Sequence, residues 1–139
     1  MDFAILKRLT EEELPFNKFL GVKVLEFSDG LCRLRLPYKP ELIGDPRRPA
    51  LHGGVISTLV DLCGGFAVWT RCRLEDRLAT IDLGVDYLRP APAADLYAEG
   101  TVRLLGNRVG NAHVVVWSEG APDEHLAVGR GVYNIRRGK

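Results

Sequence analysis

The sequence predicts an α+β domain in which one long central helix is wrapped by a curved antiparallel sheet of about five to six strands. A helical apolar period runs for about 16 residues after the string LHGG at 51–54, and it is the strongest helical signal in the chain. Beyond Arg77, apolar runs separated by Gly, Pro and Asn predict strands over 79–88, 95–105, 109–118 and 126–136. No linker or repeat interrupts the pattern, so we expect a single domain over 1–139.

The part of the chain before the long helix predicts a short helix, a β-hairpin and a loop. Three glutamates at 11–13 precede Pro15, so we expect a short helix that ends before this proline. Residues 22–27 and 31–36 alternate between apolar and polar around Ser28-Asp29-Gly30, a pattern that is typical of a hairpin. Residues 37–49 contain four prolines and Gly44, which favours a long exposed loop.

Composition excludes several classes of function. The 19 basic and 18 acidic residues nearly cancel, so no overall field attracts nucleic acid or an anionic membrane. No stretch reaches the roughly 18 apolar residues that cross a bilayer, and the N-terminus lacks the pattern of a signal peptide. We therefore expect a soluble protein of the cytoplasm.

The cysteines do not indicate a metal site or a redox motif. Cys32, Cys63 and Cys72 have no CxxC spacing, and no histidine near them completes a zinc pattern, so we expect buried thiols and no metal. Cys63 is the alternative candidate for a nucleophile, but it lies in the apolar helix, where free cysteine usually acts as a small apolar residue.

The long helix carries two kinds of face. One apolar face, which we expect to pack on the sheet, has spacings of four, three and four and comprises Val55, Leu59, Leu62 and Phe66. A second stripe contains Ser57, Asp61 and Gly65, so small groups surround the one carboxylate. Gly64 and Gly65 together cost about 2 kcal/mol of helix propensity, and either close packing of the sheet or room for a ligand explains them.

The start of the helix can hold an oxyanion, although the same His-Gly-Gly string can equally be only a helix start. Gly53 and Gly54 present backbone N–H groups at the positive end of the helix dipole, whereas His52 is better read as a structural histidine than as a general base. Gly53 and Asp61 lie about 12 Å apart along a helix, so one carbonyl cannot contact both. If both act on one substrate, Asp61 comes from another subunit, and the chemistry predicts a dimer.

Three strings of the sequence together resemble a known family. They are LHGGVISTLVD at 51–61, ATIDL at 79–83 and YLRPA at 87–91, and the acidic residue stands nine positions after the histidine. With Pro15-Phe16, Leu20-Gly21 and Gly44-Asp45-Pro46, the resemblance extends over nearly the whole chain. The chain resembles hotdog-fold thioesterases of the phenylacetate-degradation type, the PaaI-like group.

This resemblance implies an activity and a set of roles. It implies hydrolysis of acyl-CoA without metal or cofactor, by homodimers or homotetramers with active sites at the dimer interface. The N–H of Gly53 would polarise the thioester carbonyl, and Asp61 of the partner subunit would act as nucleophile or as base for water. Thr80 matches a residue that assists near the water, and His52 helps to shape the pocket.

Further residues are candidates for binding the substrate. Gly54 and Ser57 neighbour the proposed catalytic groups, and related sequences often have Asn where this chain has Asp45, which cannot donate a hydrogen bond when ionised. Arginines in loops or at strand ends are candidates for the CoA phosphates, although an exposed arginine is usually only solvated; they are Arg89, Arg108, Arg47 and Arg48. Aromatic residues that could line an acyl pocket or belong to the core are Trp69, Phe66 and Tyr87.

The sequence also allows other functions. A non-catalytic acyl-CoA sensor is the main alternative, but such regulators usually carry a DNA-binding segment, and retention of Asp61 favours catalysis. A hotdog dehydratase would need a catalytic histidine with a partner acid in another arrangement. A purely structural reading leaves a buried acid at position 61 unexplained, because burying an unpartnered charge is costly.

Overall fold

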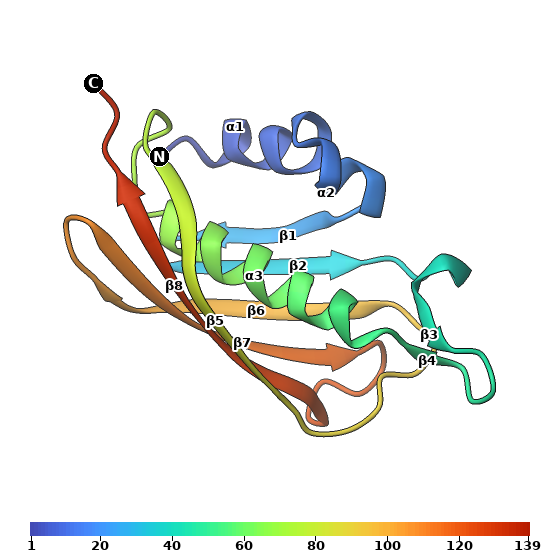
Figure 1. Cartoon of the computed structure of the whole chain (residues 1–139). Helices are drawn as coiled ribbons and strands as arrows, with labels where there is room; N and C mark the ends of the chain where they lie inside the picture. Colours follow the sequence, from blue (N-terminus) through green and yellow to red (C-terminus); the bar gives the residue numbers. More distant parts are fainter.

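A six-stranded antiparallel sheet curves around one long helix, α3 (Figure 1). The computed structural model describes all 139 residues, and the strands lie in the order β1-β2-β6-β7-β8-β5. The bounds are α3 Gly53–Trp69, β1 Lys23–Ser28, β2 Leu31–Leu36, β5 Arg77–Tyr87, β6 Leu96–Leu105, β7 Val109–Ser118 and β8 His125–Arg136. The predicted α+β architecture, with its hairpin and its four later strands, is confirmed.

The N-terminal segment is helical on both sides of the proline, which corrects the expectation of one helix ending there. Helix α1 (Phe3–Arg8) continues into the π-helical turn η1 (Leu9–Glu13), and α2 (Pro15–Leu20) follows. Pro15 begins α2 because the first helical position does not need the N–H that proline lacks. Gly21 ends α2 with a φ of 78°, in the left-handed region that favours glycine.

The segment before α3 is more ordered than an exposed loop. It contains the 3-10 turn η2 (Pro40–Leu42) and the short strands β3 (Ile43–Asp45) and β4 (Ala50–Leu51), which pair with each other. The His52 N–H donates to the Leu42 carbonyl at 2.8 Å, and a Cβ on Gly44 would lie 2.7 Å from the His52 Cα. The small hairpin therefore fixes the residue at which α3 begins.

The buried side of α3 is only partly the face that the apolar spacing predicts. Leu59 and Phe66 are buried, but Val55 and Leu62 are only partly covered. The sheet instead covers a wider arc because it curves around the helix, and this arc adds Ile56, Val60, Cys63 and Ala67. All three cysteines are buried free thiols, and burial raises the pKa of the Cys32 and Cys72 thiols, so both stay protonated.

A buried carboxylate fastens the C-terminal tail to the connection between α3 and β5. Asp76 accepts hydrogen bonds at 2.9 Å from the N–H groups of Arg73 and Gly138 and from the Arg137 guanidinium. These bonds, led by those from the two N–H groups, lower the pKa of Asp76 to about 2. The ionised form therefore stabilises the fold.

The midpoint temperature of thermal unfolding should depend on Asp76 only when its carboxyl is ionised. An unfolded aspartate has a pKa of about 3.9, so the contribution of Asp76 is complete above that pH and is lost as pH falls toward about 2. We expect Asp76→Asn to lower the midpoint at pH 6 and the deficit to shrink steeply as pH falls from about 4 through about 2. Calorimetry from pH 2 to 7 checks this, with exposed Asp123→Asn as the control. A constant deficit would show that the charge is unimportant.

No helix in the chain is both long enough and apolar enough to cross a membrane. Strand β5 forms one edge of the sheet and pairs only with β8, so its outer edge has no partner strand. Apolar side chains lie exposed along it, since Ile81 is 59% and Tyr87 51% exposed. Residues of the same strand, Thr80 and Tyr87, make hydrogen bonds to α3 at two separate places.

Candidate active site

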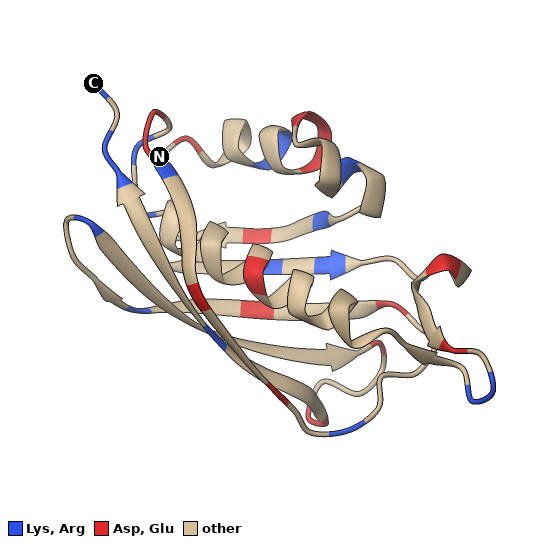
Figure 2. Cartoon of the chain, in the orientation of Figure 1, with Lys and Arg blue, Asp and Glu red and all other residues tan.

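Asp61 is the only charged residue of α3 (Figure 2). Its side chain is half-buried on the side of the helix that faces β5, where the Thr80 hydroxyl donates to Asp61 Oδ1 at 2.8 Å. The second carboxylate oxygen accepts no hydrogen bond within the chain. The carboxylate opens onto a hollow of about 120 Å³ that is lined by Asp61, Leu62, Gly65, Phe66, Trp69, Leu78, Thr80 and Tyr133.

A β-bulge allows β5 to contact α3 at two distant points. Thr80 pairs with Tyr133 and Asp82 with Val132, which leaves Ile81 as the extra residue of the bulge. Residues seven apart in a regular strand face opposite sides of the sheet. Because of the bulge, Thr80 and Tyr87 both face the helix, and each makes a hydrogen bond there.

One of the two glycine N–H groups at the start of α3 is already bound by the N-cap residue of the helix. The Gly54 N–H donates to His52 Nδ1 at 2.8 Å, so His52 caps the helix, in agreement with a structural histidine. The Gly53 N–H donates to no group within the chain. Of the two glycine N–H groups at this end, Gly53 therefore offers the one that is available to an oxyanion.

Tyr87 secures the same end of the helix from β5. Its hydroxyl donates to the Gly53 carbonyl at 2.7 Å and also forms a hydrogen bond with the Ser57 hydroxyl. Ser57 therefore contacts Tyr87 and makes no hydrogen bond to Asp61, although both lie on one stripe of the helix. A second hollow, of about 530 Å³, lies here and is lined by Gly44, Asp45, Arg48, Ala50, Leu51, His52, Gly53, Ile56, Tyr87, Leu88, Arg89, Pro90 and Ala91.

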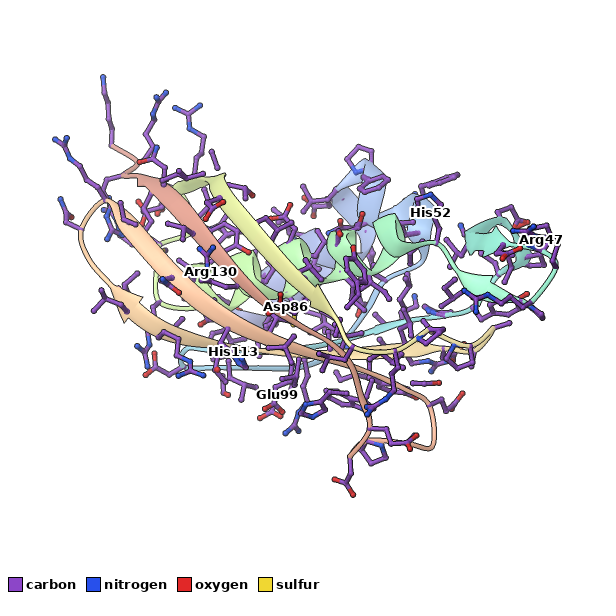
Figure 3. The ribbon with its side chains drawn as sticks, turned by 60° about the horizontal axis from the view of Figure 1, so that its bottom comes forward. Arg47, His52, Asp86, Glu99, His113 and Arg130 are labelled. Atoms are coloured by element: carbon purple, nitrogen blue, oxygen red, sulfur yellow. The ribbon has the colours of Figure 1, made fainter.

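Asp45 is held ionised by its neighbours in the chain. Its carboxylate accepts from the Arg47 N–H at 3.0 Å and from Arg47 Nε at 3.1 Å, and Arg48 Nε lies 3.6 Å away. The hydrogen bond from the Arg47 side chain is the main reason that the pKa of Asp45 is lowered. In Figure 3, Arg47 and His52 lie toward the same end of the molecule, the end at which α3 begins.

The remaining candidate arginines lie in different places. Arg89 lines the second hollow, and its guanidinium donates to the His125 carbonyl at 2.7 Å. Arg108 lies between β6 and β7 beside Arg136 and Arg137, in a separate hollow that shares no residue with the other two. Within one chain, Arg108 is therefore not brought together with the other predicted site residues.

Sequence reasoning missed Tyr133, whose hydroxyl donates to the Asp61 main-chain carbonyl at 2.9 Å. The available signal was the pair Gly64 and Gly65, which predicted a close approach without naming its partner. A Cβ on Gly64 would lie 2.5 Å from the Tyr133 hydroxyl oxygen, so packing explains this glycine. Gly65 contacts the same ring and also lines the hollow beside Asp61, so both explanations apply to it.

The predicted residues thus divide between two hollows that share no residue. Asp61 and Thr80 line the first, whereas Gly53, His52, Asp45 and Arg89 line the second. Eight residues of α3 separate Asp61 from Gly53, or about 12 Å at 1.5 Å per residue. One chain presents a carboxylate and an oxyanion donor that cannot contact the same carbonyl.

Comparisons with known proteins agree with this fold. The family model described as the thioesterase superfamily matches residues 49–124. A candidate esterase of Halobacterium salinarum is 42% identical over an alignment of 144 positions, which covers 98% of this chain and 94% of that protein. The medium/long-chain acyl-CoA thioesterase YigI of Escherichia coli is 32% identical over 119 residues, which cover 76% of this chain and 77% of YigI.

Solved structures give the same result. A protein from the thioesterase superfamily has a TM-score of 0.87 to this chain at 36% identity, covering 96% of this chain and 97% of that one. These matches identify the superfamily and do not distinguish the PaaI-like group within it. Because the family model spans more than half of the chain and the relatives match over most of its length, this protein belongs to the thioesterase superfamily and has the hotdog fold.

Proposed function

We propose that this thioester hydrolase acts on acyl-CoA, with Asp61 as nucleophile or general base and the Gly53 N–H as the group that polarises the thioester carbonyl. The observation that carries the proposal is the single carboxylate of α3, oriented by Thr80 at the mouth of an apolar hollow. An acid in that position is costly to a helix that serves only packing. It is well placed for a reaction that needs a base or a nucleophile.

The chemistry requires one group that attacks the carbonyl carbon or activates water to do so, and a second that stabilises the charge on the carbonyl oxygen. If Asp61 attacks, its free oxygen bonds to the carbonyl carbon, the CoA thiolate leaves, and water then hydrolyses the resulting anhydride. If Asp61 acts as base, it takes a proton from the water that attacks and returns that proton to the CoA sulfur as the C–S bond breaks. In both routes negative charge develops on the carbonyl oxygen, where one backbone N–H donor is worth about 3 kcal/mol.

We propose that the complete site forms between two copies of the chain. The Gly53 N–H of one subunit and Asp61 of the other would meet if the two α3 helices run antiparallel. The unpaired outer edge of β5 supports this arrangement, because an 11-residue edge strand with exposed apolar side chains is suited to pair with another chain. Homodimers of this kind can associate further into homotetramers.

The acyl group that fits the hollow beside Asp61 is apolar. The hollow continues along α3 past Leu62 and Phe66 to Trp69, whose ring stacks on Phe66 with centroids 5.8 Å apart. Eight residues of helix, about 12 Å, separate Asp61 from Trp69. We propose a medium-length acyl chain that lies along this path, which agrees with the name of the Escherichia coli relative.

Trp69 should then limit the length of the acyl chain. We expect Trp69→Leu to raise kcat/KM for long-chain relative to medium-chain acyl-CoA by about tenfold, since each methylene in an apolar pocket is worth about 1 to 3 kcal/mol. Steady-state kinetics over a series of chain lengths measures the ratio. Trp117→Leu is the matched control, because Trp117 stacks on Tyr97 instead. An unchanged ratio in Trp69→Leu would remove Trp69 from the acyl site.

The proposed function is tested by measuring CoA release with a thiol reagent from short, medium, long and aromatic acyl-CoAs. Turnover of at least one member of the panel supports the thioesterase and reveals its acyl preference. Tight binding of acyl-CoA without any turnover would instead identify an acyl-CoA binding protein. Absence of both binding and turnover would exclude acyl-CoA as the substrate.

A further inference from the structure

The aromatic ring of Tyr133 packs against three glycines beneath the middle of α3. On the helix, added Cβ atoms at Gly64 and Gly65 would lie 2.5 and 3.3 Å from atoms of Tyr133. On the strand, a Cβ at Gly131 would overlap the phenol, because residues two apart in a strand share a face. Three positions without side chains thus bring this ring against the helix.

The phenol reaches the backbone of Asp61 itself. Its hydroxyl donates at 2.9 Å to the Asp61 carbonyl, the group that a regular helix offers to the N–H four residues later, which is that of Gly65. Burial is the main reason that the pKa of Tyr133 is raised far above its usual value, so the group stays a donor. The phenol therefore stays protonated and able to donate near neutral pH.

Two residues that pair across neighbouring strands hold the side chain and the main chain of Asp61. Thr80 of β5 and Tyr133 of β8 are direct partners in the antiparallel register. Thr80 donates to the carboxylate at 2.8 Å, and Tyr133 donates to the main-chain carbonyl of the same residue. The two strands therefore define where the carboxylate lies relative to the hollow.

We propose that Tyr133 is a positioning residue for Asp61. The Tyr133 hydroxyl holds this turn of α3 at the depth that brings the Asp61 carboxylate within hydrogen-bond distance of Thr80. The inference rests on the proposed function, in which Asp61 reacts with the substrate or with water. A displacement of about 1 Å at a reacting group can cost about 10²-fold in rate. Tyr133 would thus act on turnover without contacting the reacting atoms.

The test is Tyr133→Phe, which keeps the ring packed against the three glycines and removes the hydroxyl. We expect kcat to fall about tenfold or more and KM to change less than about twofold, because substrate binding is kept while the attacking group is displaced. Tyr97→Phe is the control, since that hydroxyl reaches only Glu119. A purely structural role would lower the unfolding temperature and leave kcat of the folded enzyme unchanged, which would overturn the proposal.

A second measurement does not depend on turnover. In a crystal structure of Tyr133→Phe we expect the Asp61 carboxylate to move off Thr80, whereas the wild type keeps that bond near 2.8 Å. An unmoved carboxylate would overturn the positioning role even if the panel of acyl-CoAs had failed. Asp61-dependent turnover in the wild type, together with an unaffected Tyr133→Phe, would instead retain the proposed function and reject the inference.

Discussion

Asp61→Asn is expected to lower kcat for acyl-CoA hydrolysis by about 10²- to 10⁴-fold, the range that a positioned base contributes. Asparagine has the same shape, and its Oδ1 still accepts the Thr80 hydrogen bond, so neither the helix nor the hollow should change. What is lost is the second carboxylate oxygen, which bonds to no group of the chain and is the atom available to attack. The expected loss is therefore in chemistry and not in binding.

Measuring the rate of CoA release, and separately the affinity for acyl-CoA by calorimetry, distinguishes a loss in the chemical step from a loss in binding. Asp82→Asn is a suitable control, because this acid also lies on the bulged part of β5 but pairs with Arg130 at 2.8 Å and makes no contact with Asp61. Near-normal kcat in Asp61→Asn would mean that another group supplies the base. The assignment of Asp61 would then have to be withdrawn, although membership of the superfamily would stand.

Gly53→Pro is expected to lower kcat by about 10²- to 10³-fold, because it removes the one N–H proposed to stabilise the oxyanion. The helix tolerates the change well, since proline is favoured at the first helical position. His52 already has the extended backbone that precedes a proline, with φ −61° and ψ 134°. Gly53→Ala adds a Cβ at an ordinary 3.4 Å from Tyr87 and retains the N–H, so it measures the steric part alone.

Mixing the two defective proteins tests whether the site is shared between subunits. A mixed dimer of Asp61→Asn and Gly53→Pro chains would contain one site with both groups intact and one with neither. Random exchange should therefore restore about a quarter of the wild-type activity, as half of the dimers are mixed and each has one working site. If both groups act within one chain, mixing would restore nothing, and the shared site would be rejected.

The sequence predicted those parts of the structure that depend on local pattern. The position of α3 and the boundaries of the strands follow from periodicity and from residue preferences at element ends. The approach of Thr80 to Asp61 followed only from the resemblance, since 19 residues separate the two. Local pattern contains no information on such a contact.

The contacts that sequence reasoning missed depend on sheet register. Tyr133 is 72 residues from Asp61, and nothing in its own strand marks it as the partner of the glycine pair. Leu62 fits an apolar helical period but lines the hollow, because the period does not reveal how far the sheet curves around the helix. The pairing of β3 with β4 was hidden for a similar reason, as four prolines made the segment resemble a simple loop.

The bulge at Ile81 divides β5 into two parts, and on each side of it the side chains alternate between the two faces of the sheet in a different register. Before it, Leu78 and Thr80 face α3, and after it Tyr87 does so despite the odd spacing. Deleting one residue at the bulge would make the alternation continuous along β5 and turn the phenol of Tyr87 away from Gly53. Inserting a second residue there would have the same result. The length of this strand is thus constrained by parity, and a redesign that changes it should add or remove residues in pairs.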